Sequence, residues 1–526
     1  MPYNYDAIII GAGHNGLVTA AFLAKAGKKI LVLEGREVLG GAAATEEIFP
    51  GFKFNTGAHD AGLFLPEIGK KLKLQRSGLE FIESPAAVCT LQPDGPALTL
   101  WRDIKKSQEE IAHFSKTDAV KFPQFCQHVE RLTRVLAGIR TSTPPHVKSI
   151  NLNDLLPWLK SGLQLKRLGK KDMMAFMRAL PMSVRQFLDE WFESEILKGV
   201  LGASGVTGSM QGPMASGTTF MMLYHTIGSS GGFRASKFVR GGMGQLSKAL
   251  AETAREHGAE IRTGVEVKQI VINEYQAKSV VLANGEEFSA QAIISNADPR
   301  STFFGLVGAP NLGPQFNRMV KNIRFRGTTA KMNLALSGLP KFKGVSNPES
   351  QLGGHIIICP SLEYLERAYD NAKYGTFSKQ PYLDIVIPSL LDSTLAPEGQ
   401  HVMSVTMQYA PYNLKSGDWD KQRAKLAEVI IKTISRYSSN FRKLILHQHL
   451  LTPLDLERDY GLTEGSIFHG QMGLDQLLFM RPVPGWGRYR TPVENLYLCG
   501  AGTHPGGGVT GAPGYNAARE VLKDLK

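Results

Sequence analysis

The sequence predicts an α/β fold in which one sheet domain is assembled from widely separated stretches of chain and a second lobe is inserted between them. Two apolar runs, 6–10 and 30–33, are typical of parallel strands buried on both faces. A third, 496–499, enters a glycine-rich turn near the carboxyl end. Residues 67–230 show mainly helical periodicity, and residues 300–480 alternate strand-like runs with helices. The inserted lobe should therefore combine a helical part, about residues 105–230, with a mixed sheet.

Length and composition limit the class of protein. At 526 residues the chain is too long for one ordinary domain, and its 43% hydrophobic and 20% charged residues are typical of a globular protein. No apolar run approaches the roughly 18 residues that a transmembrane helix needs. No secretion signal is recognisable at the amino end, so a cytoplasmic location is expected. The net charge of +13 suits anionic lipids or acidic ligands, but the basic residues form no nucleic-acid-binding motif, and nucleic acid is not an expected partner.

The first strand runs directly into a dinucleotide-binding fingerprint, Gly11-Ala12-Gly13-His14-Asn15-Gly16. Gly11 permits a tight turn, Gly13 lets the backbone approach a pyrophosphate, and Gly16 lets the following helix pack closely on the strand. That helix is expected over 15–26, with its amide-rich end facing the phosphates. The second strand ends in Glu34, whose carboxylate would accept hydrogen bonds from the adenosine ribose hydroxyls. Strand, turn, helix, strand and acid at this spacing predict a bound dinucleotide.

Two further glycine-rich segments distinguish FAD from NAD. Gly40-Gly41-Ala42 follows the ribose acid, where a backbone must again pass close to the cofactor. Residues 500–511 form a second glycine-rich turn, and a helix is expected after it over 512–522. The amino end of that helix would direct the amides near Val509 and Thr510 at the N1 and O2 edge of a flavin. The sequence therefore predicts a flavoprotein.

These motifs resemble those of the bacterial phytoene desaturase family, in the superfamily of FAD enzymes that includes the amine oxidases. The resemblance extends over nearly the whole chain and is strongest in the segments already named and in Asp475-Gln476-Leu477 with Arg481-Pro482. Within that family the chain is most similar to the branch of desaturase-like β-carotene ketolases and pyridine nucleotide-disulfide oxidoreductase domain-containing proteins. The resemblance implies a bipartite Rossmann-type FAD domain formed by residues 1–66, 231–300 and 481–526. Residues 67–230 and 301–480 would form the inserted substrate-binding lobe, a mixed sheet with helices.

The resemblance also completes the expected cofactor site. It implies that the backbone of Val267 pairs with adenine and that the strand ending at Ser295-Asn296 returns the chain to the substrate lobe. The predicted cofactor-binding residues are Gly11, Ala12, Gly13, His14, Asn15, Gly16, Glu34, Gly35, Arg36, Gly40, Gly41, Ala42, Val267, Ser295, Asn296, Gly500, Ala501, Gly502, Pro505, Gly506, Val509 and Thr510.

The implied activity is an FAD-dependent oxidoreduction of a long isoprenoid or carotenoid-type lipid, by desaturation, saturation, ketolation or isomerisation. Ala42 stands where ordinary phytoene desaturases often have arginine, which argues against phytoene itself as the substrate. No Cys-x-x-Cys pair and no second nucleotide fold are recognisable, so oxygen or a membrane quinone is the expected electron acceptor. Leucines interleaved with lysines and arginines over residues 155–180 predict a peripheral membrane contact, although the same pattern suits an ordinary lobe helix.

Few protein groups need be reactive in flavin chemistry, because the cofactor carries the difficult step. His504 in the carboxyl-terminal turn and His59-Asp60 after the second glycine pair are the candidate proton-transfer groups, although they could equally orient loops or bind FAD. No metal site is expected. Two alternatives remain: an amine oxidase, which would place an aromatic pair beside the flavin where residues 500–511 have none, and a scaffold protein in which FAD is structural.

Overall fold

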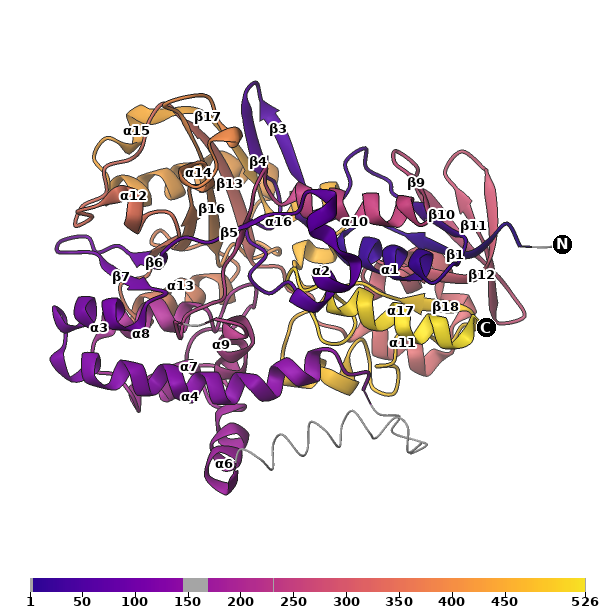
Figure 1. Cartoon of the computed structure of the whole chain (residues 1–526), viewed down its shortest axis with the longest axis horizontal. Helices are drawn as coiled ribbons and strands as arrows, with labels where there is room; N and C mark the ends of the chain where they lie inside the picture. The colour runs from indigo at the N-terminus through magenta and orange to yellow at the C-terminus, as the bar shows by residue number, and fades with distance from the viewer. Residues whose placement is uncertain (1–2, 145–168, 230, 526) are drawn as a thin grey trace.

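The computed structural model describes residues 3–144, 169–229 and 231–525, and it contains two large sheets side by side (Figure 1). The strand order of the first sheet is β10-β11-β12-β1-β2-β9, and β18 also pairs with β12. These strands are β1 (Tyr5–Ile10), β2 (Ile30–Leu33), β9 (Glu260–Arg262), β10 (Val267–Asn273), β11 (Gln276–Leu282), β12 (Glu287–Ser295) and β18 (Leu496–Leu498). Since β1, β2, β9, β12 and β18 pair in parallel, their carboxyl ends meet at one edge of this sheet.

Three helices cover the first sheet: α1 (His14–Lys25), α10 (Gly244–Glu256) and α17 (Ala512–Asp524). Figure 1 shows them beside β1, with the two chain ends on the same side of the molecule. The predicted helices and strands here agree with the structure to within a few residues, because each begins or ends at a glycine or at a switch in hydrophobic period. The α/β prediction is thus confirmed.

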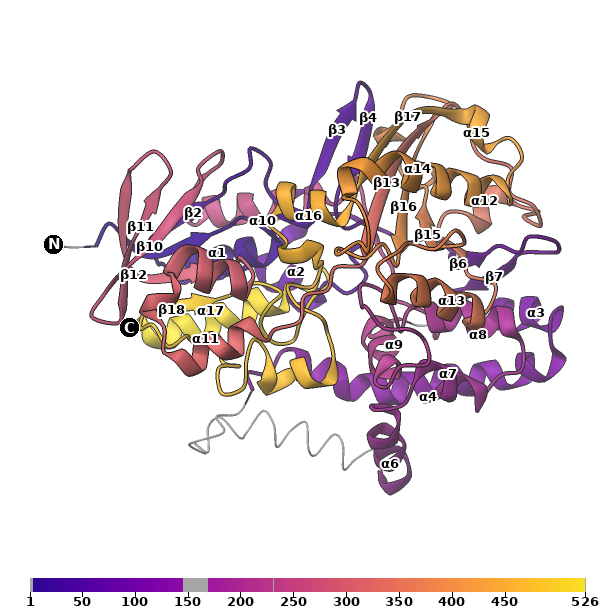
Figure 2. The same ribbon diagram turned by 180° about the vertical axis from the view of Figure 1, so that it is seen from behind.

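The second sheet is antiparallel except for the parallel pair β14–β6, and its order is β17-β13-β16-β15-β14-β6-β7. Its strands are β6 (Ala86–Thr90), β7 (Leu98–Trp101), β13 (Thr329–Leu336), β14 (His355–Ile358), β15 (Tyr382–Val386), β16 (His401–Gln408) and β17 (Ile445–Leu451). β14, β15 and β16 coincide with strand-like apolar runs in the sequence at 356–358, 382–387 and 401–407, whereas β13 and β17 were not predicted. Seen from behind, α13 (Leu362–Lys373) and α14 (Trp419–Ser435) lie beside this sheet (Figure 2).

A helical layer lies below the second sheet in Figure 1. It contains α3 (Ile104–Ala112), α4 (Lys116–Arg140), α6 (Gly169–Ala179), α7 (Val184–Asp189), α8 (Glu195–Ala203) and α9 (Thr218–Thr226). The stretch 182–198, which has one continuous helical pattern in sequence, forms two helices, α7 and α8. Asp118 on α4 holds the break between them, because its carboxylate accepts hydrogen bonds from the backbone N–H groups of Glu193 (3.0 Å) and Ser194 (2.8 Å).

The remaining elements are short. They are two small two-stranded antiparallel sheets, β3 (Thr45–Phe49) with β4 (Phe52–Asn55) and β5 (Phe81–Ile82) with β8 (Phe238–Val239), and the helices α2 (Pro66–Leu72), α11 (Pro314–Lys321), α12 (Pro348–Gln351), α15 (Phe441–Leu444) and α16 (Pro453–Tyr460). Separate apolar cores lie in the helical layer and on either side of each sheet. Among the described residues, none of the helices combines the length and apolarity needed to cross a bilayer.

Candidate functional site

The fingerprint turn lies between β1 and α1, and its glycines are required by close backbone packing. Gly11 has a φ of +93°. A Cβ atom on Gly16 would lie 2.2 Å from the oxygen of Gly11, and one on Gly13 would lie 2.7 Å from Nδ2 of Asn296. The contact at Gly16 is with backbone, so only glycine fits there, whereas a side chain at position 13 would require the Asn296 side chain to move. The turn is therefore a tightly packed backbone surface at the carboxyl end of β1.

The second glycine pair lies directly beside this turn. Gly13 and Gly40 form a parallel bridge, and the N–H of Gly40 donates to the oxygen of Ala12 at 2.9 Å. Gly40 has a φ of +110° and Gly41 a φ of +55°. The two glycine segments, predicted separately from the sequence, thus form one continuous backbone surface, which Ala42 extends.

Glu34 stands at the end of β2 and is 8% exposed. Its Oε2 accepts the N–H of Ala12 at 2.6 Å, and its Oε1 accepts the N–H of Arg36 at 3.0 Å. Each carboxylate oxygen has two lone pairs, so both keep acceptor capacity for ribose hydroxyl groups. The backbone of Glu34 also accepts the N–H of Val265 at 2.9 Å, which brings the start of β10, including Val267, to this corner.

Arg36 turns away from the glycine surface. Its guanidinium pairs with Glu46 at 3.0 Å and lies 4.5 Å from the ring centre of Tyr460. The structure therefore gives the Arg36 side chain partners of its own, while the backbone at Gly35 and Arg36 remains beside Glu34.

The end of β12 connects the amino- and carboxyl-terminal motifs. The N–H of Asn296 donates to the oxygen of Ile10, and the N–H of Cys499 donates to the oxygen of Ser295. The hydroxyl of Ser295 is buried against that of Thr302 at 2.7 Å, so this side chain is engaged inside the protein. A Cβ atom on Gly500 would lie 2.5 Å from the oxygen of Asn296. The Gly500-Ala501-Gly502 turn is thus pressed against the same edge as the fingerprint.

The rest of the carboxyl-terminal turn is walled by apolar side chains. A Cβ atom on Gly506 would meet Met472 at 2.8 Å, one on Gly507 would meet Phe468 at 2.1 Å, and one on Gly508 would meet Leu63 at 3.0 Å. Pro505 and Val509 are buried in the same turn. The oxygen of Thr510 accepts the N–H of Leu65 at 3.1 Å, just before α17 begins. The predicted turn residues are therefore brought together with the other two glycine segments.

Several polar atoms around this surface are buried without a protein partner. They include Nε2 of His14, Oδ1 of Asn15 and Nδ1 of His469. The His469 atom lies 3.2 Å from the position of a Cβ atom on Gly500, so it belongs to this surface although the sequence analysis did not single it out. Burial lowers the pKa of His14 to about 4, which leaves the ring neutral at pH 7. Buried polar groups are nearly always bonded, so the donor set fits a polar cofactor such as FAD.

Arg481 adds a buried cation to this side of the molecule. Its guanidinium is 2% exposed and donates to the backbone oxygens of Phe468, Gly470, Gln476 and Ala501. Among the described residues no carboxylate pairs with it. Burial lowers its pKa to about 10, which still leaves it charged at neutral pH. Arg481 therefore joins residues 468–476 to the 500–502 turn and leaves one positive charge uncompensated there.

The catalytic candidates fall into two separate environments. His504 is 1% exposed, and its Nε2 donates to the oxygen of Ile139, at the carboxyl end of α4, at 3.0 Å. Burial lowers its pKa to about 4. This contact joins the carboxyl-terminal turn to the helical layer, and it favours an orienting role for His504.

His59 and Asp60 join a buried set of ionisable side chains at the junction of the two sheets. We call this set the junction cluster; its members are His59, Asp60, Arg234, Lys331, His355 and Asp384. Asp384, on β15, forms an ion pair with Arg234 at 2.6 Å. Its carboxylate also accepts a hydrogen bond from Nδ1 of His355, on β14, at 2.7 Å. Nε2 of His355 lies 3.6 Å from the carboxylate of Asp60, and that carboxylate lies 3.9 Å from Nε2 of His59.

Electrostatics set the protonation of the cluster. Burial lowers the pKa of His59 to about 3 despite the nearby Asp384. Burial alone would raise the pKa of Asp384, but the charges of Arg234 and His355 outweigh it and hold the pKa well below its usual range. At neutral pH, His59 is therefore neutral and Asp384 is ionised.

Lys331 is the member that the sequence analysis missed. It is 3% exposed on β13, and its amine donates to the backbone oxygens of Asn55 and Gly57. A Cβ atom on Gly57 would lie 2.3 Å from the oxygen of Ala42, so the segment that Lys331 binds rests on the second glycine pair. Burial lowers the pKa of Lys331 to about 7. The available signal was one lysine in the otherwise apolar or uncharged run 329–336.

The four cysteines are all free and buried. Burial raises the pKa of each thiol to about 12, so the reactive thiolate is scarce at neutral pH. These side chains are unsuited to dithiol redox chemistry.

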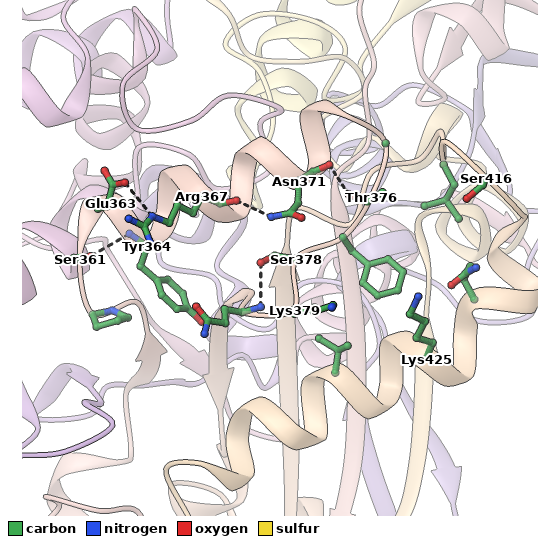
Figure 3. A pocket seen from close by; sticks show the side chains of 17 residues that line it. Ser361, Glu363, Tyr364, Arg367, Asn371, Thr376, Ser378, Lys379, Ser416 and Lys425 are labelled. Atoms are coloured by element: carbon green, nitrogen blue, oxygen red, sulfur yellow. Dashed lines mark hydrogen bonds and ion pairs between the residues drawn. The ribbon is translucent and has the colours of Figure 1, made fainter.

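A pocket of ≈ 840 Å³ lies elsewhere, beside α13 and α14 (Figure 3). Its walls come from residues 360–380 and 414–429 and include none of the predicted cofactor residues. Ser361 caps α13 by accepting the N–H of Tyr364 at 3.0 Å, and Arg367 donates to Glu363 at 3.0 Å. These polar side chains thus bind one another along the rim, and the pocket is distinct from the glycine surface.

Comparisons with known proteins agree with this architecture. Residues 9–61 match the NAD(P)-binding Rossmann-like domain, and residues 153–342 match the flavin containing amine oxidoreductase family. The first match spans the fingerprint, Glu34 and the second glycine pair. The chain binds FAD and is an amine-oxidase-like oxidoreductase.

Three relatives cover nearly the whole chain. Pyridine nucleotide-disulfide oxidoreductase domain-containing protein 2 of Rattus norvegicus is 38% identical over 99% of this chain and 94% of its own length. A limonene dehydrogenase subunit of Castellaniella defragrans is 27% identical over 99% and 95%. Phytoene desaturase of Fusarium fujikuroi is 25% identical over 99% and 89%. This chain is an FAD-dependent oxidoreductase that belongs to the family of pyridine nucleotide-disulfide oxidoreductase domain-containing protein 2.

Proposed function

We propose that the chain transfers hydrogen to or from a long hydrophobic substrate of isoprenoid or carotenoid type, by desaturation, saturation, ketolation or isomerisation. Two relatives with full-length similarity are named for isoprenoid hydrocarbons, one for limonene dehydrogenation and one for phytoene desaturation. When bound, FAD supplies a hydride acceptor or donor.

The observation that carries this proposal is the apolar wall of the carboxyl-terminal turn. Leu63, Phe468 and Met472 press on Gly506 to Gly508, and the Tyr224 hydroxyl donates to the oxygen of Gly507 at 2.8 Å. Phe468, Met472 and Tyr224 belong to the apolar core that continues into α4, α7, α8 and α9. A dry surface of this kind suits a hydrocarbon chain, because a polar substrate would lose hydration there without new partners.

The cofactor residues named from the sequence would hold FAD in this proposal. The glycine turns at 11–16 and 40–42 would approach the pyrophosphate, and Glu34 would bind the ribose. The amide end of α17 would stabilise negative charge on the flavin edge. His14, Asn15 and His469 have free polar atoms that can bind the same cofactor.

Lys331 is the proposed proton-exchanging group, because burial brings its pKa to about 7. A neutral amine has two N–H groups and one lone pair, and the oxygens of Asn55 and Gly57 can take both N–H groups. The lone pair then remains to take a proton. His59 and Asp60, the sequence-based candidates, would act beside it.

Oxygen or a membrane quinone remains the proposed electron acceptor, and contact with a membrane surface remains a proposal. Part of the expected contact, 155–168, lies outside the described residues. On the described part, Met174 is 60% and Met177 56% exposed on α6, which also carries Lys170 and Lys171. Exposed methionines beside lysines suit an anionic lipid surface. Co-sedimentation with anionic liposomes that is lost in the double variant Met174→Ser, Met177→Ser would support this contact.

The function is tested by anaerobic addition of candidate substrates to the purified flavoprotein. A monoterpene, phytoene and β-carotene, each in detergent, are compared with putrescine, and the flavin absorbance and the products are followed by spectroscopy and mass spectrometry. Reduction of the flavin by an isoprenoid, with a product that has lost two hydrogens, is expected. Lipids extracted from the protein as purified would narrow the choice of substrate.

Each contrary result has a distinct meaning. Reduction by the amine alone would replace the proposal with amine oxidation. Rapid bleaching by NADPH would contradict oxygen or quinone as the partner in electron transfer. If every substrate left the flavin oxidised and no lipid copurified, a structural role for FAD would be the better interpretation.

A further inference from the structure

The junction cluster contains more acidic charge than its one permanent cation can balance. Asp60 and Asp384 supply two carboxylates, whereas Arg234 supplies one charge that cannot be lost near neutral pH. Burial makes His59 neutral, as described above. Lys331 can supply a further positive charge when its amine is protonated.

Ion pairs and hydrogen bonds hold the carboxylates of Asp60 and Asp384 in fixed positions. Asp384 is held from two sides, by Arg234 at 2.6 Å and by His355 at 2.7 Å. Asp60 accepts the N–H of Gly62 at 2.9 Å and lies within 3.9 Å of both histidines. Ser236 completes the set, since its hydroxyl lies 3.1 Å from Nε2 of His355.

Lys331 and Asp384 both pair with Thr406 on β16, the strand between them, so their side chains leave the same face of the second sheet. Four other parts of the chain complete the cluster. The segment after β4 contributes His59 and Asp60, the segment after α9 contributes Arg234, β14 contributes His355 and β15 contributes Asp384. The two carboxylates favour the charged amine, and burial opposes it. His59 adds a smaller interaction with Lys331.

We propose that Asp60 and Asp384, fixed by Arg234 and His355, are positioning residues that keep a proton available on Lys331 at the edge of the flavin site. The inference rests on the proposed function, in which Lys331 exchanges a proton with substrate. Asp384 is the fixed anchor, and Asp60 is the more accessible carboxylate, with its side chain 18% exposed against 4% for Asp384.

A divalent metal is a less suitable occupant of the same cluster. His59, Asp60 and His355 could present ligand atoms within 4.8 Å of one another. Arg234, however, lies 2.7 Å from Nδ1 of His355 and would repel a metal ion held by that ring. The guanidinium of Arg234 already supplies positive charge to the carboxylate of Asp384, as a metal ion would.

The test measures the titration of Lys331 directly. Protein containing lysine labelled with ¹³C at Cε is titrated by NMR with FAD bound, and the Lys331 signal is assigned by its loss in Lys331→Met. A midpoint near pH 7 is expected in the parent protein. Asp60→Asn should lower that midpoint by about one pH unit, because the substitution removes a favourable charge and keeps Oδ1 as acceptor for Gly62.

Two further variants complete the design. Asp384→Asn should lower the midpoint at least as far, and if its unpaired Arg234 prevents folding, Asp60→Asn carries the test alone. Asp103→Asn is the matched control, because Asp103 is an exposed helix cap whose Oδ1 accepts the N–H of Lys105 at 2.8 Å. The control should leave the midpoint unchanged.

An unchanged midpoint in Asp60→Asn would overturn the proposal, and so would a Lys331 midpoint at the ordinary value for lysine. Stoichiometric divalent metal in the purified protein, lost in His59→Ala, would replace it with a metal site. If the midpoints shift as expected while no isoprenoid reduces the flavin, the network stands and the proposed substrate class fails.

Discussion

The two sides of the proposed flavin site, the proposed cofactor side and the proposed substrate side, are built by opposite means. On the cofactor side, the surface consists mostly of backbone, in which glycines at 11, 13, 16 and 40 let separate turns touch. On the substrate side, six ionisable side chains meet in a buried cluster. The first surface depends on the absence of side chains, and the second depends on their charges. Substitutions that add volume should therefore do most damage on the cofactor side. Substitutions that remove a charge should do most damage on the substrate side.

Gly16→Ala should have the largest effect. The new methyl group would lie 2.2 Å from the oxygen of Gly11, so backbone must move at the point where β1 meets α1. We expect a loss of more than about 3 kcal/mol in unfolding free energy and a loss of bound FAD. Denaturant unfolding and the flavin-to-protein absorbance ratio measure the two effects. Gly313→Ala, where nothing lies within 4 Å, is the control; equal losses in both variants would remove the packing argument.

Arg481→Met tests a buried positive charge on the cofactor side. The substitution keeps an apolar stem but leaves the oxygens of Phe468, Gly470 and Ala501 without this donor. We expect a loss of about 3 kcal/mol in unfolding free energy and weaker retention of FAD. Arg519→Met, in which an exposed arginine donates to one oxygen, of Thr141, should cost far less. If the two variants were equally stable, backbone packing alone, without the hydrogen bonds of Arg481, would hold residues 468–476 against the 500–502 turn.

Lys331→Met tests charge on the substrate side. We expect flavin reduction by substrate to slow about 100-fold, with FAD still bound. In the parent protein, dehydrogenation should slow as the pH falls below about 7, because protonation removes the lone pair of Lys331. The variant should lack this dependence. Stopped-flow measurement from pH 5.5 to 9 checks both points; a full-speed variant with the parental pH profile would rule Lys331 out.

His504→Gln should have the smallest effect. Burial holds the pKa of His504 near 4, below its ordinary value near 6.5, so between these pH values the unfolded state binds more protons. Stability is therefore lost as the pH falls through this window. Glutamine keeps a donor for the oxygen of Ile139 without the titration, so the variant should lose roughly 2 kcal/mol less than the parent between pH 7 and 4.5.

Thermal unfolding across this range measures the difference. His257→Gln, at an exposed position, should follow the parent curve. A His504 variant that follows the parent curve as well would mean that this ring is not kept neutral by burial.

The same contrast explains what could be predicted from the sequence. Local sequence patterns identify Gly11 to Gly16, Glu34 and the 500–511 turn, because each glycine is required by the conformation or packing of its own backbone turn. The junction cluster has no local pattern. Its members come from positions 59, 60, 234, 331, 355 and 384, and only the strand order β13-β16-β15-β14 in the second sheet brings Lys331, Asp384 and His355 together.

Individual residues show the limit of sequence patterns. His59 and Asp60 stand out in the sequence for their place after the glycine pair, yet their partners, His355 and Asp384, lie on the second sheet. His504 stands out for the same kind of reason, but its ring binds the end of α4. Sequence spacing identifies these residues as notable, and only the tertiary contacts separate a charged network from a structural hydrogen bond.

The close packing of α17 on the fingerprint has a consequence for the order in which the protein is made. A Cβ atom on Gly514 would lie 2.1 Å from the oxygen of Asn15, and β18 pairs with β12 just before this helix. The fingerprint emerges from the ribosome roughly 500 residues before this helix, a delay of roughly half a minute to two minutes at ordinary synthesis rates. During that interval the nascent first sheet lacks both a strand and a covering helix. Flavin capture should therefore follow the synthesis of α17, and chaperones would have an unfinished apolar face to shield until then.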